Sequence, residues 1–297
     1  MAKLRNLVDT TWLASHLKDT SLRVFDCTMK SEHTKLDSSN LAVERKPSNV
    51  YVSGRPEYDA AHIPGAGFLD IQEELSDTTS SLPFMAPSAE KFAETMSRHG
   101  VDQNTFVVLY SSETPAWATR VWWLLRLFGF DETAVLDGGW DLWQKEGRPI
   151  SQEPANYPPA CFIPKPRPHL VVQKDDVIAA LSNESHTLIN TLSEELFFSK
   201  EPNRYGRPGR IPGSKNIPFP SLLDPESRKF QETTQCQALV EKVISPTQSP
   251  AITYCGGGIT ATMLDFVLVG LGHEGIPIYD GSLSEWAPDT SLPMECG

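Results

Sequence analysis

Short apolar runs alternate along the chain with longer segments in which apolar residues recur at helical spacing. In the second half, residues 188–190 and 252–254 have the β-branched and aromatic character of buried strands, and residues 276–279 form a third such run. Residues 236–244 and 261–271 carry helical patterns. Strands and helices that alternate at this length predict an α/β fold, in which a mainly parallel sheet is flanked by helices on both faces.

A proline-rich stretch divides the chain nearly in half. Residues 151–168 read SQEPANYPPACFIPKPRP, with six prolines in eighteen residues. Prolines at this density exclude a helix or a central strand and favour an extended, fairly stiff linker. We therefore predict a first domain over residues 1–150, a linker over 151–168 and a second domain over 169–297.

The two halves repeat the same short motifs in the same order. The matched pairs are HIPGA at 62–66 with RIPGS at 210–214, VVLYS at 107–111 with AITYC at 251–255, and LDGGW at 136–140 with YDGSL at 279–283. The offsets of 148, 144 and 143 residues are similar enough to indicate a duplicated domain. Asp137 and Asp280 each begin an Asp-Gly turn, in which we expect the side chain to bond its own backbone.

Composition and charge exclude several classes of function. The net charge of −12 argues against a general nucleic-acid binder, and no apolar run reaches the ~18 residues of a membrane span. The five cysteines show no CxxC or Cys/His metal spacing, and no glycine-rich nucleotide loop is present. The first residues lack the apolar core of a signal peptide. We expect a cytoplasmic protein with free thiols and without a metal, a cofactor, a nucleic-acid partner or a membrane partner.

A cysteine followed by three glycines is the strongest candidate for chemistry. Cys255 comes directly after a predicted buried strand, residues 256–258 are all glycine, and a helix begins within the next few residues. Glycines let the backbone curl so that several N–H groups point inward, and a helix start adds further unpaired N–H groups. A thiol in this position is expected to ionise more readily than a free thiol, and the N–H groups would surround any anion attached to its sulfur.

The matching stretch of the first half lacks this chemistry. Ser111 stands at the cysteine position, the glycines are missing, and Glu113 would repel an anion. We therefore predict that the first domain is catalytically silent. Its expected role is to support the second domain and to form one wall of the site.

Basic residues cluster in the otherwise acidic second domain. Five of its nine Lys and Arg residues lie between Lys200 and Lys215. This clustering, in a turn-rich segment, suggests a pocket for an anion. The candidate ligands are Arg204, Arg207 and Arg210. If the anion is a substrate, we expect removal of Arg207 to weaken its use more than it weakens folding.

These motifs resemble the rhodanese superfamily of sulfurtransferases, in the tandem form with a silent first domain and an active second one. The resemblance rests on HIPGA, RIPGS, LDGGW, YDGS and the loop CGGGIT at 255–260. It implies that Cys255 takes a sulfane sulfur from a small anion, thiosulfate or 3-mercaptopyruvate, and holds it as a persulfide. The acceptor would be cyanide or a thiol, with thioredoxin left open. The residues that cradle the persulfide would be Gly256, Gly257, Gly258, Ile259 and Thr260.

The loop also departs from the superfamily pattern. Relatives that prefer thiosulfate carry basic residues where this chain has Gly256 and Gly257, and those that prefer 3-mercaptopyruvate carry a serine at position 257. Relatives of both kinds have an arginine soon after the strand that ends at Asn190, and residues 191–196 contain none. The donor therefore stays open. Two alternatives also stay open: a non-catalytic sulfur-sensing or binding module, and a Cdc25-type phosphatase, whose loop would be one residue longer and end in arginine.

Overall fold

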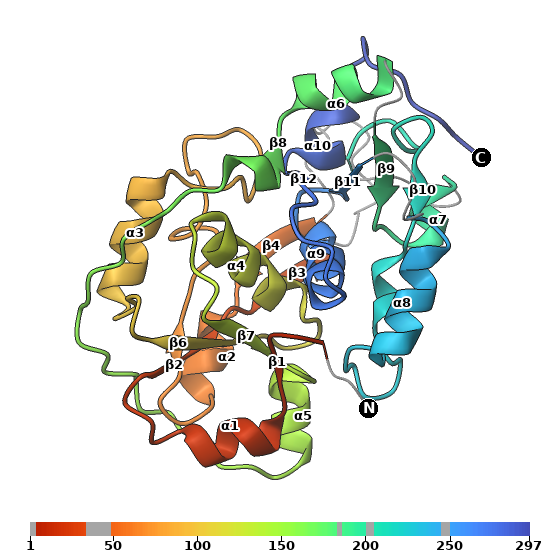
Figure 1. Cartoon of the computed structure of the whole chain (residues 1–297). Coiled ribbons are helices and arrows are strands. Elements are labelled where there is room, and N and C mark those ends of the chain that lie inside the picture. Colours follow the sequence, from red (N-terminus) through yellow and green to blue (C-terminus); the bar gives the residue numbers. More distant parts are fainter. Residues whose placement is uncertain (1–3, 34–48, 183–185, 200–204, 245–249) are drawn as a thin grey trace, which may run out of the picture.

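Each half of the chain folds around its own five-stranded parallel sheet (Figure 1). The computed structural model describes residues 4–33, 49–182, 186–199, 205–244 and 250–297. In spatial order, the strands of the first sheet are β1 (Leu7–Val8), β7 (Thr133–Leu136), β6 (Phe106–Tyr110), β2 (Leu22–Asp26) and β5 (Gly67–Phe68). In the corresponding order, those of the second are β8 (Val171–Val172), β12 (Ile278–Tyr279), β11 (Ala251–Tyr254), β9 (Thr187–Asn190) and β10 (Lys215–Asn216).

Helices cover both faces of the sheets, which confirms the predicted α/β class. The first domain contains α1 (Thr10–His16), α2 (Arg55–Ala60), α3 (Ala89–Arg98), α4 (Ala116–Leu127) and α5 (Gly139–Lys145). The second contains α6 (Lys174–Ser182), α7 (Glu194–Phe197), α8 (Thr233–Glu241), α9 (Thr260–Gly270) and α10 (Ser282–Trp286). Because side chains alternate across a strand, Val108 of β6 packs with Leu13 of α1, whereas Leu109 belongs to the core that contains α3 and α4.

The two halves share details of hydrogen bonding as well as strand order. At the end of β6, the Tyr110 hydroxyl accepts a bond from Ile63 N–H at 3.4 Å. At the end of β11, the Tyr254 hydroxyl accepts one from Ile211 N–H at 3.1 Å. Each bond ties the Ile-Pro-Gly turn of its domain to the edge of the sheet where the active loop is expected.

The proline-rich segment packs against the first domain. Residues 152–167 contain no helix or strand. The Tyr157 hydroxyl accepts a bond from Val24 N–H at 3.0 Å and donates one to Gly65 O at 2.6 Å. Lys165 N–H donates to the carbonyl of Phe128 at 2.8 Å. The segment is therefore held along its length by the domain that precedes it.

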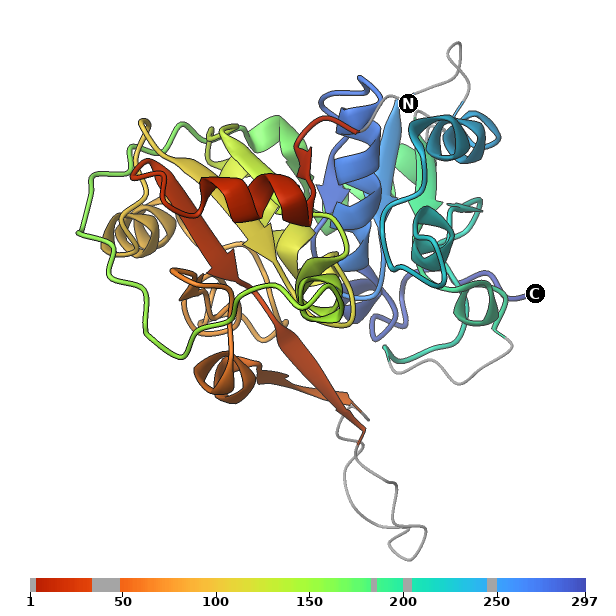
Figure 2. The same cartoon turned by 90° about the horizontal axis from the view of Figure 1, so that it is seen from below.

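An antiparallel hairpin projects from the first domain. It consists of β3 (Met29–His33) and β4 (Asn49–Ser53), and Figure 2 shows it extending away from the rest of the domain. Tyr51 packs edge-on against the rings of Phe84 and Trp117, with centroid distances of 5.3 Å in both cases. The hairpin is thus anchored next to α4. In the described part of the chain, no helix has the length and apolar character needed to cross a membrane.

The two domains meet along α4 and α9, which lie side by side (Figure 1). The hydroxyls of Thr119 and Thr262 are 2.9 Å apart in this buried interface, and the rings of Trp122 and Phe266 pack edge to face at 5.0 Å. Residues of both domains belong to one continuous apolar core. The interface therefore resembles the interior of a domain, and it places the first domain directly against the helix that follows Cys255.

The aspartates of the two Asp-Gly turns link the domains, a role that the sequence analysis did not predict. Asp137 Oδ1 accepts a bond from Phe230 N–H of the second domain at 3.0 Å. Asp280 Oδ2 accepts one from Ala86 N–H of the first domain at 2.8 Å. The two bonds are equivalent, since both pairs of residues are related by the repeat offsets of 143 and 144 residues.

A buried carboxyl in α9 makes stability depend on pH. Both oxygens of Asp265 lack a hydrogen-bond partner among the described residues, and burial raises the pKa of this carboxyl to about 7, although Arg126 opposes the shift. The unfolded chain ionises this group at lower pH than the native one, so stability decreases as pH rises from about 4 to about 7 and stays lower above that.

We expect Asp265→Asn to raise the free energy of unfolding by ~2–4 kcal/mol near pH ~8, and by less than ~1 kcal/mol near pH ~4. Denaturant unfolding at the two pH values measures the difference. An equal effect at both would contradict the assignment, because only the ionised carboxylate carries the cost.

Candidate active site

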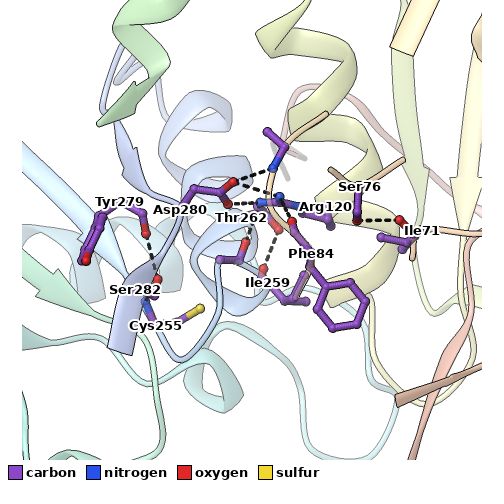
Figure 3. A network of polar contacts seen from close by, with 12 residues as sticks. Ile71, Ser76, Phe84, Arg120, Cys255, Ile259, Thr262, Tyr279, Asp280 and Ser282 are labelled. Atoms are coloured by element: carbon purple, nitrogen blue, oxygen red, sulfur yellow. Dashed lines mark hydrogen bonds and ion pairs between the residues drawn. The ribbon is translucent and has the colours of Figure 1, made fainter. Parts of the chain in front are cut away.

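Cys255 lies at the carboxyl end of β11, and α9 begins five residues later at Thr260. Its side chain is buried, with 2% of its surface exposed. Its N–H donates to Ser282 Oγ at 3.0 Å, and the Ser282 hydroxyl donates to Tyr279 O at 2.8 Å (Figure 3). The start of α10 thus holds the base of the loop, and the sulfur points toward the part of the loop that ends at Ile259.

The carbonyl groups of the loop are held by neighbouring donors. Cys255 O accepts a bond from Leu283 N–H at 3.2 Å. Gly256 O accepts two bonds from Ser284, from N–H at 2.8 Å and from the hydroxyl at 2.7 Å. Ile259 O accepts a bond from the Thr262 hydroxyl at 2.7 Å. In a trans peptide the N–H points away from the preceding C=O. Each of these bonds therefore turns the next N–H toward the opposite side of the loop.

The N–H groups of the loop are open. Within the described part of the chain, none of the backbone N–H groups of residues 256–261 donates to a protein acceptor. Six open N–H groups follow the thiol along the loop, and the positive end of the α9 dipole lies at the same place, so we describe this loop as a candidate anion-binding cradle. The role of residues 256–260 in holding a persulfide stays a prediction.

Two of the three glycines are required by close contacts. A Cβ on Gly258, which has a φ of +73°, would lie 2.4 Å from Asp280 Oδ1. A Cβ on Gly256 would lie 1.9 Å from the hydroxyl of Tyr205, whose ring occupies that space. At Gly257 the nearest atom would be 3.4 Å away, an ordinary contact. Gly256 and Gly258 therefore let other side chains approach the loop backbone closely.

The last loop position is fixed by a bond to a neighbouring strand end. The hydroxyl of Thr260 lies 2.9 Å from that of Thr191, which follows β9 and is fully buried. Thr191 N–H in turn donates to Tyr254 O at 3.0 Å. The start of α9 is thus tied to the sheet on the side opposite α10.

Sequence analysis missed a buried ion pair between the domains. Arg120 of α4 and Asp280 are 0% and 2% exposed, and Arg120 Nη1 lies 2.6 Å from Asp280 Oδ1. The same nitrogen donates to Gly258 O at 3.0 Å. The available signal was an arginine in the middle of an otherwise apolar, tryptophan-rich helix, because such a charge is stable there only with a partner.

The arginine cluster does not converge on Cys255 in the way that its spacing suggested. Arg204 lies outside the described residues, so its role stays a prediction. Arg207 holds the C-terminal segment, since its Nε, Nη1 and Nη2 donate to the carbonyls of Ala287, Leu292 and Asp289 at 2.8, 2.8 and 2.5 Å. These bonds give Arg207 a structural role, and the effect of its removal on donor use stays a prediction.

Arg210 is also part of the structural framework. It is buried and pairs with Glu295, and its Nη1 donates to Gly297 O at 3.1 Å. Its guanidinium stacks on the ring of Phe197 at 4.4 Å. Arg210 therefore fastens the C-terminal residues to the Ile-Pro-Gly turn, which is a correction to its predicted role as an anion ligand.

The remaining thiols differ from Cys255 in their surroundings. Burial raises the pKa of Cys27 well above its usual value and that of Cys236 to about 11, so both stay protonated at neutral pH. Cys161 and Cys296 are exposed, and all five thiols are free. Among the five, Cys255 is the one seated in the open N–H cradle described above.

The corresponding loop of the first domain has closed on itself. The Ser111 hydroxyl donates to Thr114 O at 2.6 Å, and Pro115 has no N–H. Four N–H groups of the loop have acceptors within the first domain at 2.7 to 3.3 Å: Ser112 on Thr28 Oγ1, Glu113 on Asp141 Oδ2, Thr114 on Ser112 O and Ala116 on Thr114 Oγ1. An anion would have to displace these bonds, which supports the prediction of a silent domain.

We expect a cysteine alone to be insufficient in this loop. The double variant Ser111→Cys, Cys255→Ser should show less than ~1% of wild-type sulfur transfer, because the N–H groups around position 111 are already used. The single variant Ser111→Ala should keep its rate within about twofold of wild type. Steady-state assays measure both. Recovery of activity in the double variant would show that a cysteine alone is sufficient in this loop, and a large loss in Ser111→Ala would mean that the first domain is not silent.

The fold and the cysteine loop define a class: a tandem α/β protein with a cysteine between a strand end and a glycine loop that leads into a helix. A family model for the rhodanese-like domain matches residues 9–146 and 176–289. The chain belongs to the rhodanese-like family, which confirms the resemblance drawn from its motifs.

Named relatives match over most of the chain. Thiosulfate/3-mercaptopyruvate sulfurtransferase 2 of Arabidopsis thaliana is 32% identical, over 97% of this chain and 86% of the relative. The 3-mercaptopyruvate sulfurtransferase of Escherichia coli (strain K12) is 31% identical, over 97% of both chains. The crystal structure of SseA from Escherichia coli, described as having the rhodanese fold, aligns with a TM-score of 0.77 and 29% identity over 93% of this chain and 98% of SseA. The chain is an enzyme of the sulfurtransferase class.

Proposed function

We propose that this enzyme moves a sulfane sulfur from thiosulfate or 3-mercaptopyruvate to a thiophilic acceptor through a persulfide on Cys255. One observation carries the proposal: the Cys255 thiol sits beside a loop in which the N–H groups of residues 256–261 have no protein acceptor in the described part of the chain. A persulfide is an anion, and such N–H groups stabilise anions without first having to break other bonds.

In the first step, the Cys255 thiolate attacks the transferable sulfur. With thiosulfate, the S–S bond breaks and sulfite leaves with the bonding electron pair. With 3-mercaptopyruvate, the C–S bond breaks, and the thiol proton of the donor ends on the methyl carbon of pyruvate. Both reactions leave Cys255 as a persulfide with one negative charge on the outer sulfur.

In the second step, an acceptor attacks the outer sulfur and the Cys255 thiolate leaves. Cyanide gives thiocyanate, and a thiolate gives a persulfide of the acceptor, so that the enzyme works by a two-step, ping-pong route. Small thiols and thioredoxin are the acceptors to compare with cyanide.

The surroundings of Gly256 bear on the choice of donor. Tyr205 occupies the space where a side chain at position 256 would project, so the loop cannot present a basic residue there without moving the tyrosine. Residues 191–196, which follow β9, contain no arginine that could bind the donor. Arg204 is therefore our remaining candidate for the carboxylate or sulfonate group of the donor.

Mass spectrometry of the intact protein tests the proposal. Wild-type protein incubated with either donor should gain the mass of one sulfur atom, about 32 Da, and lose it again on addition of cyanide. Kinetics with both donors and several acceptors would then rank them. Failure of both donors to load Cys255 would contradict the proposal and favour the alternative of a sulfur-binding module. The phosphatase alternative is opposed by a loop that ends in Thr260 where an arginine is required.

A further inference from the structure

We propose that Arg120, in the silent first domain, is a positioning residue for the sulfur-carrying loop of the second domain. It holds the Gly258 carbonyl and thereby aims the following N–H, that of Ile259, at the persulfide on Cys255. This inference rests on the proposed function, because it assigns a task in stabilising the persulfide.

The guanidinium of Arg120 reaches the loop from across the domain interface. It is fully buried, and Nη1 donates both to Gly258 O at 3.0 Å and to Asp280 Oδ1 at 2.6 Å. Nη2 donates to Asp280 Oδ2 at 3.3 Å and to the carbonyl of Phe84 (Figure 3). Two contacts with a carboxylate fix the plane of the guanidinium, so the direction of the bond to Gly258 O is fixed as well.

Holding this carbonyl determines where the next N–H points. The peptide between Gly258 and Ile259 is planar and trans, so its N–H and C=O point in opposite directions. The carbonyls of Cys255, Gly256 and Ile259 are held by donors of the second domain. The Gly258 carbonyl is held by a residue of the first domain. One N–H of the cradle is therefore oriented from outside the domain that carries the thiol.

The repeat shows that the interface does not require this arginine. Helices α4 and α9 begin 144 residues apart, so the counterpart of Arg120 in α9 is Leu264. The backbone bonds of Asp137 and Asp280 occur on both sides, but the two interface helices differ, since α4 has Arg120 where α9 has Leu264. A buried ion pair contributes little to net stability, because desolvation offsets the attraction. The asymmetry therefore points to a role in the loop.

We expect Arg120→Met to lower the single-turnover rate of persulfide formation by about 10- to 100-fold, with the donor KM changed by less than about threefold. Loading should raise the melting temperature of wild-type protein, since the persulfide pairs with the open N–H groups, and this gain should fall by about half in the variant. Arg120→Lys keeps the positive charge but loses the paired N–H groups of the guanidinium. Its loading rate and its gain in melting temperature should lie between those of wild type and Arg120→Met.

Asp137→Ala is the matched control, because it removes the equivalent link between the domains on the silent side. It should lower the melting temperature of loaded and unloaded protein equally and leave the loading rate unchanged. If wild type does not load, the proposed function fails. The inference is overturned if wild type loads but Arg120→Met and Asp137→Ala show equal losses, both in the loading rate and in the rise of melting temperature on loading. In that case Arg120 is only structural.

A second measurement needs no variant and decides the question if Arg120→Met does not fold. In ¹⁵N-labelled wild-type protein, persulfide formation should shift the Ile259 N–H resonance downfield, as expected for a new charge-assisted hydrogen bond. An Ile259 resonance that does not move when mass spectrometry shows full loading would overturn the inference.

Discussion

Cys255→Ser should lower sulfur transfer by ~10⁴-fold or more and abolish the gain of one sulfur atom on incubation with donor. A serine hydroxyl is almost wholly protonated at neutral pH and cannot hold a transferable sulfane sulfur. Cys255 is buried, so the size of its replacement matters, and serine is close to isosteric with cysteine. The fold should therefore be kept. Intact-mass spectrometry and donor-dependent thiocyanate formation measure the two effects, and circular dichroism checks the fold.

The exposed thiols provide the controls. Cys161→Ser and Cys296→Ser should retain more than about half of the wild-type rate, because neither thiol lies in the cradle. The buried thiols Cys27 and Cys236 have raised pKa values and should not load. A sulfur atom found on any of these four residues in the Cys255→Ser variant, with transfer retained, would move the reactive site away from the glycine loop.

Gly258→Ala should lower kcat/KM by ~10²-fold and the free energy of unfolding by ~2–4 kcal/mol. The added methyl would lie 2.4 Å from Asp280 Oδ1 and 3.1 Å from Arg120 Nη1, on a backbone with a φ of +73°. Relief of this clash must move either the loop or the ion pair. Both movements turn N–H groups away from Cys255, so activity should fall by more than the loss of folded protein explains.

Gly213→Ala separates strain from steric clash. Gly213 has a φ of +72°, nearly the same as that of Gly258, but a Cβ there meets nothing within 4 Å. The control should lose only ~1 kcal/mol of stability and keep its activity. Chemical unfolding and steady-state kinetics on both variants give the comparison. Equal losses of activity would show that the contacts of Gly258 with Arg120 and Asp280 are irrelevant to the loop.

Features that depend on a few neighbouring residues were predictable. The expected strands at 188–190 and 252–254 fall within β9 and β11, and the helix expected at 261–271 is α9, displaced by one residue. The helix expected at 236–244 begins three residues earlier as α8, where Glu232 and Gln235 form a capping box. Apolar periodicity reports which face is buried, whereas the ends of a helix depend on capping side chains.

Predictions about charged residues were less successful. The cluster from Lys200 to Lys215 suggested an anion pocket, yet Arg207 and Arg210 bind the C-terminal segment. Those partners lie 80 to 87 residues further along the chain. A guanidinium has five donors on a long side chain, so its neighbours in sequence say little about which acceptor it reaches.

By itself, the sequence determined the duplicated α/β fold and the position of the thiol, because strand patterns, glycine conformations and helix starts are properties of short segments. Only the tertiary structure decided which loop keeps its N–H groups open and which charged side chain reaches it. The first-domain loop is closed by Thr28 and Asp141, and the second-domain loop is held by Arg120, 138 residues away from Gly258. Such contacts depend on how α4 and α9 pack. They join residues that are far apart along the chain, and no periodic pattern in the sequence predicts which residues will meet.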